Sequence, residues 1–210
     1  MIKVFIADDH ALIREGVKNL VSQSNEIQIV GETASAVSLI ESLRKVKCDV
    51  LILDLSMPGK HGLDLLKEIK IIFRDLKILI MTMLPEDQFA KRTFKAGAAG
   101  YLSKESAPDE LIKAIIRIAS GKKYITPSLA ELLANDLDGD SEKPVHDLLS
   151  DREFQIMKMI AAGKSQTEIA NELSIGVTTV NTYRGRILRK LDLGSNAELI
   201  HFAYRNHLIK

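Results

Sequence analysis

Five polar side chains follow short apolar runs in this sequence, and their types are suited to phosphoryl chemistry. They are Asp8, Asp9, Asp54, Thr82 and Lys104. Three carboxylates held close together repel one another and favour a hard divalent cation such as Mg²⁺, which prefers oxygen ligands. A lysine and a threonine hydroxyl add a cation and a hydrogen-bond donor for phosphoryl oxygens. A metal, a nucleophilic carboxylate and a phosphate clamp together indicate formation of an aspartyl phosphate.

An alternation of strands and helices must position these side chains. Apolar patterns predict strands over 3–7, 27–30, 50–53, 76–81 and 99–102, and helices over 11–24, 37–46, 63–73, 89–94 and 111–119. Five strands that are each followed by a helix predict an α/β fold, in which a parallel sheet is covered on both faces. The expected strand order is 2-1-3-4-5, the flavodoxin-like arrangement. Since parallel strands end at one edge, the five side chains should converge there.

The strand before Asp54 is a continuous apolar run, as expected of a strand buried on both faces. Pro58 and Gly59 then turn the chain. Each residue also has a structural interpretation: Asp54 or Thr82 as a helix cap, the Asp8-Asp9 pair as a helix start, and Lys104 as solvated charge. The coincidence of all five at strand ends favours the functional interpretation.

Residues 2–120 resemble the receiver domain of two-component response regulators. The resemblance is carried by the pair Asp8-Asp9, the Asp54-x-x-Met-Pro-Gly turn, Thr82 and Lys104. Glu105 stands where the family often has Asp. The resemblance implies that Asp54 is the phosphoacceptor.

The resemblance also implies a role for the neighbouring residues. It implies a Mg²⁺ site formed by Asp8 (through water), Asp9, Asp54 and the main-chain carbonyl of Ser56. Thr82 and Lys104 would grip the phosphoryl group. Tyr101 matches the switch aromatic of the family, which turns inward when Thr82 moves toward the phosphate.

Size, cysteine content and charge constrain the organisation of the chain. At 210 residues and 46% hydrophobic composition, the chain suits one large domain or two small ones. Its single cysteine rules out an internal disulfide. Neither a signal pattern nor a run of apolar residues long enough for a membrane span is found, which predicts a cytoplasmic protein with no membrane partner.

Charge is distributed unevenly along the chain. Residues 122–147 carry 3 Lys and Arg against 6 Asp and Glu, whereas residues 148–210 carry 9 Lys and Arg against 6 Asp and Glu. A basic second module beyond an acidic connector is expected to contact an anionic partner.

The predicted organisation is a domain over 1–121, a linker over 122–147 and a second domain over 148–210. Gly, Ser, Pro and acidic residues favour the linker, with one or two helical turns over 129–133. Three capping boxes, Ser150/Glu153, Ser165/Glu168 and Ser195/Glu198, open apolar helical patterns in the second domain. Four helices are predicted, over 151–162, 166–173, 177–191 and 196–206. The middle pair, joined through Ser174-Ile175-Gly176, predicts a helix-turn-helix within an all-α domain.

The helix over 177–191 has an apolar face and a basic polar face. Val180, Ile187 and Leu191 are spaced to pack inward. Basic clusters are usually solvated surface, but this one lies on the second helix of a helix-turn-helix. A glycine inside a helix costs roughly 1 kcal/mol relative to alanine, so Gly185 favours close approach to a DNA groove. The candidate DNA-binding residues are Lys164, Ser165, Thr178, Thr179, Asn181, Thr182, Arg184, Gly185, Arg186, Arg189 and Lys190.

Residues 148–208 resemble the LuxR-type (NarL/FixJ-type) DNA-binding domain. The matching motifs are Leu149-Ser150-Asp151-Arg152-Glu153, Gly163-Lys164-Ser165, Glu168-Ile169-Ala170, Thr179-Val180 and Lys190-Leu191. The resemblance implies that the helix over 177–191 enters the major groove of double-stranded DNA. It also implies that the last helix mediates dimerisation through Leu199, Ile200 and Ala203. Asn181 and Gly185 depart from the family pattern.

The two resemblances imply a phosphorylation-dependent transcriptional regulator. A sensor histidine kinase would phosphorylate Asp54, and a homodimer would bind paired half-sites, with RNA polymerase as a further expected partner. No enzyme activity is expected beyond the phosphorylation and dephosphorylation of the receiver itself. The alternative is a DNA-binding regulator whose receiver is controlled without phosphorylation.

Two rival functions fit less well. Phosphatases and mutases of the dehalogenase type also use an Asp nucleophile at a strand end, but they carry a second Asp two residues on, where this chain has Ser56. Flavin-binding modules share the sheet type. An acidic edge suits a metal better than a flavin phosphate.

Overall fold

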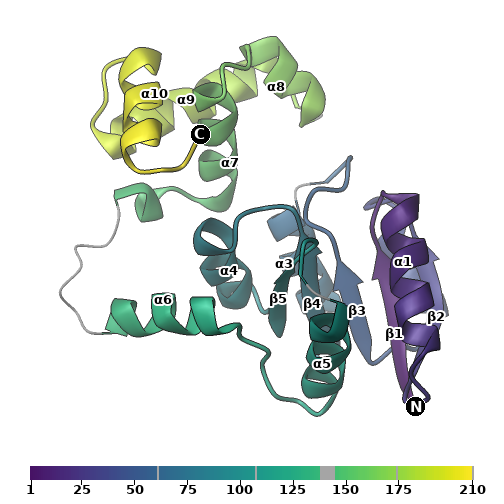
Figure 1. Ribbon diagram of the computed structural model, residues 1–210. Helices are drawn as coiled ribbons and strands as arrows, with labels where there is room; N and C mark the ends of the chain where they lie inside the picture. Colours follow the sequence, from purple (N-terminus) through teal and green to yellow (C-terminus); the bar gives the residue numbers. More distant parts are fainter. Residues whose placement is uncertain (61, 107, 138–144, 174, 210) are drawn as a thin grey trace. The chain divides into compact units, whose positions relative to one another are not determined.

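The chain folds into two compact units, Met1–Ala134 and Asn135–Lys210. The structure is a computed structural model that describes residues 1–60, 62–106, 108–137, 145–173 and 175–209 (Figure 1). No helix within those ranges is both long and apolar enough to cross a bilayer.

The first unit is a five-stranded parallel sheet with helices between the strands. The strands are β1 (Ile2–Ala7), β2 (Ile27–Thr33), β3 (Val50–Leu53), β4 (Lys77–Thr82) and β5 (Gly100–Ser103). The helices are α1 (Ala11–Ser22), α2 (Leu39–Lys45), α3 (Gly62–Ile72), α4 (Glu86–Lys95) and α5 (Pro108–Ala119). The strand order is β2-β1-β3-β4-β5, which confirms the predicted topology.

The register of the sheet brings the strand ends to one level. Ala7 lies opposite Leu53, and Leu53 lies opposite Ile80. At the far pair, Thr82 lies opposite Ser103. The residues that follow β1, β3 and β5 therefore emerge beside Thr82 at the carboxyl edge of the sheet.

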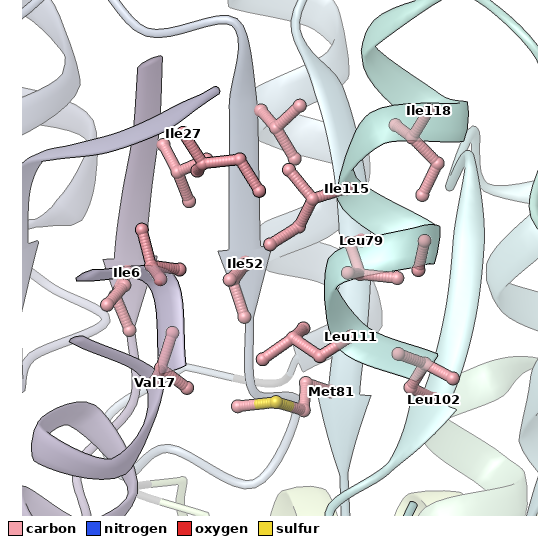
Figure 2. Packing of buried hydrophobic residues seen from close by; sticks show 14 residues of the cluster. Ile6, Val17, Ile27, Ile52, Leu79, Met81, Leu102, Leu111, Ile115 and Ile118 are labelled. Carbon is pink, nitrogen blue, oxygen red and sulfur yellow. The ribbon is translucent and has the colours of Figure 1, made fainter. Parts of the chain in front are cut away.

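Alternate residues of the central strands pack under helices on opposite faces. Figure 2 shows Ile6, Ile52 and Leu79 on the face that α1 and α5 cover, against residues such as Val17 and Ile115. The residues directly before and after these in each strand point to the other face of the sheet. Because both faces are covered, β3 is buried along its whole length, and the position of Asp54 at its end is tightly constrained.

The packing of the Phe5 ring requires a glycine at position 31 in β2. The pairing of β1 with β2 shifts between Val4 and Phe5, so that Phe5 faces Gly31. A Cβ atom at Gly31 would lie 2.5 Å from the Phe5 ring. Gly31 therefore lets the Phe5 ring pack against the backbone of β2.

The segment after α5 belongs to the first unit, which corrects the predicted start of the linker. The main-chain N–H of Tyr124 donates to the Ala99 carbonyl at 2.9 Å, and Tyr124 bridges Gly100 in parallel. The helix α6 (Pro127–Leu137) is longer than the one or two turns predicted, and Leu129 on it is buried. The acidic stretch over 138–144 lies outside the described residues.

The second unit is helical, as predicted. A 3₁₀ turn η1 (Val145–Leu148) precedes α7 (Asp151–Ala161), α8 (Gln166–Glu172), α9 (Val177–Leu191) and α10 (Asn196–Arg205). Their ends lie within one residue of the predicted bounds. Of the residues predicted to join α8 to α9, Ser174 lies outside the described ranges.

The three predicted capping boxes differ in detail. The boxes that begin at Ser150 and Ser165 form completely, each with a reciprocal pair of main-chain and side-chain hydrogen bonds. At Ser195 only half forms, because the Glu198 carboxylate accepts from the N–H of Gly194 at 2.9 Å. Each Ser nevertheless satisfies one N–H group of its helix.

Candidate functional site

Four side chains offer metal-ligand atoms at the carboxyl edge of the sheet. One atom each from Asp8, Asp9, His10 and Asp54 lies within 4.8 Å of the others. Asp8 and Asp54 are 0% and 1% exposed and follow β1 and β3 directly. The carboxylates predicted to converge therefore do so, in a place where their charges need compensation.

Lys104 supplies that compensation. Its Nζ atom lies 2.6 Å from Asp54 Oδ2 and 2.8 Å from Asp8 Oδ2, and its side chain is 3% exposed. Burial lowers the pKa of Lys104, but the hydrogen bonds and charges of Asp54 and Asp8 outweigh burial and raise the pKa above its ordinary value. Lys104 is therefore held charged between two carboxylates.

Thr82 connects the turn after β3 to the loop after β4. Asp54 Oδ1 accepts a hydrogen bond from the Ser56 N–H at 2.9 Å. The hydroxyl oxygens of Ser56 and Thr82 are 3.3 Å apart, and Thr82 Oγ1 accepts weakly from the Leu84 N–H at 3.4 Å. A displacement of the buried Thr82 hydroxyl would therefore affect both segments.

Tyr101 is bound to the same loop. Its ring is fully buried, and its hydroxyl donates to the Leu84 carbonyl at 2.7 Å. Burial, and then the charges of Glu86, Asp87 and Asp54, raise the pKa of Tyr101, so it stays protonated as a donor. The ring is thus inward while Thr82 contacts Ser56.

The donors of this site fit a divalent cation. Asp8 Oδ2 and Asp9 Oδ1 are buried carboxylate oxygens at this edge of the sheet. The first lies beside Lys104 Nζ and the second lies 3.0 Å from His10 Nδ1. Because carboxylate oxygens are the preferred donors for Mg²⁺, the receiver-like unit has an acidic cluster that can bind a divalent metal. His10 was missed by sequence reasoning, although it directly follows the acidic pair.

Helix α9 has the two faces expected of a DNA-reading helix. Val180, Ile187 and Leu191 are buried inside the unit. The exposed residues on α9 among the candidates are Thr178, Thr179, Asn181, Thr182, Gly185, Arg186, Arg189 and Lys190. A Cβ atom at Gly185 would meet no atom within 4 Å, so packing inside the described chain does not require this glycine.

Several of the predicted DNA contacts have partners within the helical unit. Lys190 Nζ donates to Glu153 Oε2 at 2.7 Å. Arg184 Nε donates to Asn196 Oδ1 at 2.6 Å, and Lys164 pairs with Glu172. Ser165 caps α8. These side chains therefore have structural roles that compete with the predicted contacts to DNA.

The dimerisation prediction requires a correction. Leu199 and Ala203 are both 0% exposed, because they face the core of their own unit. Ile200, one position further round the helix, is 40% exposed. Of the three residues predicted to form a dimer surface on α10, only Ile200 is available to a partner.

Comparison with known families agrees with the two units. Residues 4–116 match the response regulator receiver domain. Residues 147–203 match the bacterial regulatory proteins of the luxR family.

Relatives match almost the whole chain. Response regulator UvrY of Escherichia coli (strain K12) is 36% identical over 209 residues, which cover 99% of this chain and 96% of UvrY. Response regulator GacA of Pseudomonas aeruginosa is 35% identical over 210 residues, which cover 100% of this chain and 98% of GacA.

Solved structures give the same result. RcsB from Salmonella enterica serovar Typhimurium, described as bound to promoter P1flhDC in the presence of phosphomimetic BeF3−, matches with a TM-score of 0.62 and 31% identity. The match covers 96% of this chain and 97% of that one. The chain therefore belongs to the two-component response regulators that carry a LuxR-type DNA-binding domain.

Proposed function

We propose that this response regulator accepts a phosphoryl group on Asp54 from a sensor histidine kinase and then binds paired DNA half-sites as a dimer in the cytoplasm. The observation that carries the proposal is the environment of Asp54. Its carboxylate is buried beside the cation Lys104 and next to two further carboxylates, and Ser56 in the turn that follows contacts the Thr82 hydroxyl. A buried carboxylate that served only as a helix cap would need neither the cation nor the acidic neighbours.

Transfer begins with attack of the Asp54 carboxylate on the phosphorus atom of a phosphohistidine. The new bond joins an Asp54 oxygen to phosphorus, while the phosphorus–nitrogen bond breaks and its electron pair stays on the imidazole of the kinase. Asp9, Asp54 and the Ser56 carbonyl, with Asp8 acting through water, would hold Mg²⁺, which would supply positive charge for the phosphoryl oxygens. Lys104 and Thr82 then hold those oxygens by charge and by hydrogen bonding.

The bound phosphoryl group changes the loop after β4. Lys104 exchanges a carboxylate partner for a phosphoryl oxygen, and Thr82 gives up its contact with the Ser56 hydroxyl. Since the Leu84 main chain contacts both Thr82 and Tyr101, this movement shifts the hydrogen bond that Tyr101 donates. The receiver thereby favours one of two states, which is a usual mode of phosphorylation control.

DNA recognition is assigned to the exposed face of α9. Asn181 can pair with an adenine edge, and Thr182 can contact a thymine methyl. Arg189 can hold a phosphate. Arg189→Ala should therefore weaken binding to all sequences, whereas Asn181→Ala should relax the preference at one base. RcsB, which is described as bound to DNA in a solved structure, supports this assignment.

The test of Asp54 is phosphoryl incorporation from a small radiolabelled phosphodonor in the presence of Mg²⁺. The parent should be labelled, and Asp54→Asn should not, with both proteins giving the same circular dichroism spectrum. Label that persists in Asp54→Asn would overturn the assignment of the acceptor. A parent that is never labelled but still selects DNA would favour the alternative, a receiver controlled without phosphorylation.

A further inference from the structure

His10 lies at the start of a helix, but its side chain does not make the capping hydrogen bond that is usual at this position. It is the N-cap residue of α1, a position that Ser, Thr, Asp and Asn commonly occupy in order to bond the first N–H groups. The His10 side chain makes no such bond. Its main-chain N–H instead donates to Asp8 Oδ1 at 2.8 Å. The backbone therefore fixes His10 next to the acidic pair, and its ring faces the carboxylates.

The neighbours of the His10 ring nitrogen make conflicting demands on it as a hydrogen-bonding group. Nδ1 lies 3.0 Å from Asp9 Oδ1, 3.2 Å from Asp8 Oδ1 and 3.3 Å from Lys104 Nζ. Two of these neighbours accept hydrogen bonds and the third donates them, so one ring nitrogen cannot satisfy all three. A metal ion that takes lone pairs from the nitrogen and from the carboxylate oxygens removes this conflict.

The spacing of the donors agrees with coordination of one ion. The candidate atoms of the cluster, His10 included, all lie within 4.8 Å of one another. An octahedral ion with bonds of about 2.1 Å holds opposite ligands about 4.2 Å apart. His10 remains 58% exposed, so its ring can adjust toward an ion. Asp9 Oδ1, which is buried and accepts no hydrogen bond from the described residues, lies 3.0 Å from the same ring nitrogen.

We infer that His10 is a metal ligand that lets this site bind imidazole-preferring divalent metals such as Ni²⁺ or Zn²⁺ in addition to Mg²⁺. Oxygen donors alone suit Mg²⁺, whereas imidazole suits Zn²⁺, Cu²⁺, Fe²⁺ and Ni²⁺. This inference rests on the proposed function only in that both use the same carboxylates. His10 sets which metals occupy the site, and Asp54 accepts the phosphoryl group whichever metal is bound.

Calorimetry of the full chain with Mg²⁺ alone and with Ni²⁺ alone tests the inference. His10→Ala should weaken Ni²⁺ binding by about 10–100-fold and change Mg²⁺ binding by less than about 2-fold. The matched control is His201→Ala, which removes an exposed imidazole from α10 and should change neither affinity. Equal Ni²⁺ affinity in the parent and in His10→Ala would overturn the inference.

Pulsed electron paramagnetic resonance of bound Cu²⁺, another imidazole-preferring metal, gives a second readout. The parent should show a ¹⁴N coupling that His10→Ala lacks, and a parent without this coupling would contradict ligation by His10. Phosphoryl labelling with Mg²⁺ separates the two claims. If the protein is labelled but the parent and His10→Ala bind Ni²⁺ equally well, the inference is wrong and the proposed function stands. If the protein is not labelled but shows the ¹⁴N coupling, the proposed function is wrong and the metal site stands.

Discussion

The ammonium group of Lys104 lies 2.6 Å from Asp54 Oδ2 and joins the ends of two strands that are 50 residues apart in the chain. The same Nζ atom lies 2.8 Å from Asp8 Oδ2. All three side chains are nearly inaccessible to water, so the cation and the two carboxylates depend on one another for charge compensation. The site is therefore held together by the groups that the proposed phosphoryl transfer rearranges.

Replacing Lys104 by Gln should destabilise the receiver unit. The change leaves two buried carboxylates facing each other, and breaking a buried pair in this way costs about 3 kcal/mol. Urea unfolding in EDTA should show this loss, and added Mg²⁺ should restore part of it. The double variant Lys104→Gln/Asp54→Asn should recover stability, because one of the two charges is gone. A Lys104→Gln protein as stable as the parent in EDTA would contradict the account.

Glu86 anchors the segment that leaves the receiver. Its carboxylate accepts a hydrogen bond from Thr126 Oγ1 at 2.7 Å and another from Ser128 Oγ at 2.8 Å. Glu86 is the first residue of α4 and lies four residues after Thr82. A shift of the loop after β4 should therefore reach the start of α6 through these two hydrogen bonds.

The double variant Thr126→Val/Ser128→Ala should loosen α6 without changing the sheet. Loss of both hydrogen bonds should speed amide exchange over 127–134 by roughly 5–30-fold. Ser120→Ala is the matched control, since its hydroxyl bonds the Arg117 carbonyl at 2.7 Å and not Glu86. A phosphodonor with Mg²⁺ should alter exchange over 127–134 in the parent and much less in the double variant. Identical exchange in all three proteins would remove the role assigned to Glu86.

Glu153 should make the stability of the helical unit depend on pH. Burial would raise the pKa of Glu153, but Lys190 and the hydrogen bonds from Ser150 outweigh it and lower the pKa from its ordinary value of 4.5. A carboxylate with a lowered pKa in the folded state stabilises the fold above pH 4.5, and the contribution is lost as the pH falls through the folded-state pKa.

Glu153→Gln provides the test, because Gln can keep the capping bond to the Ser150 N–H but cannot pair with Lys190. At pH 7 the variant should lose about 1 kcal/mol, a modest value since Lys190 is partly exposed. Thermal unfolding of the two proteins should converge below the folded-state pKa of Glu153. A difference that is the same at pH 7 and at acid pH would show that the charge is not responsible.

Gly185→Ala should separate stability from DNA binding. Alanine favours the helix by about 1 kcal/mol, and no described atom lies within 4 Å of the added Cβ, so the melting temperature should rise. DNA affinity should fall, because the methyl group keeps α9 away from the groove. Gly16→Ala in α1 is the matched control, since that position is equally open. It should stabilise its own unit and leave DNA affinity unchanged; a Gly185→Ala protein that binds DNA as tightly as the parent would refute the groove contact.

The sequence was sufficient for the sheet and for the carboxylates at its edge. Buried parallel strands are continuous apolar runs, so the ends of β1, β3 and β4 can be found without tertiary information. The capping boxes located the helices of the second unit for a similar reason, since the pattern of Ser and Glu is local.

Features that depend on distant contacts were not predictable. The bonds of Glu86 to Thr126 and Ser128 cross 40 and 42 residues, and no periodicity signals such a pair. Leu199 and Ala203 share a helical face in the sequence, but the pattern alone cannot tell whether that face meets its own core or a second chain. His10 was overlooked because an exposed residue at a helix start has many harmless interpretations.

The most direct test of the account is selection of random-sequence DNA by mobility shift, with and without a small phosphodonor and Mg²⁺. The account predicts that the parent selects paired half-sites, that phosphodonor strengthens the selection, and that Asp54→Asn shows selection without the strengthening. Sequence-selective binding by the parent that is equally strong with and without phosphodonor would contradict control through Asp54. Binding without any sequence selection would contradict the role given to α9.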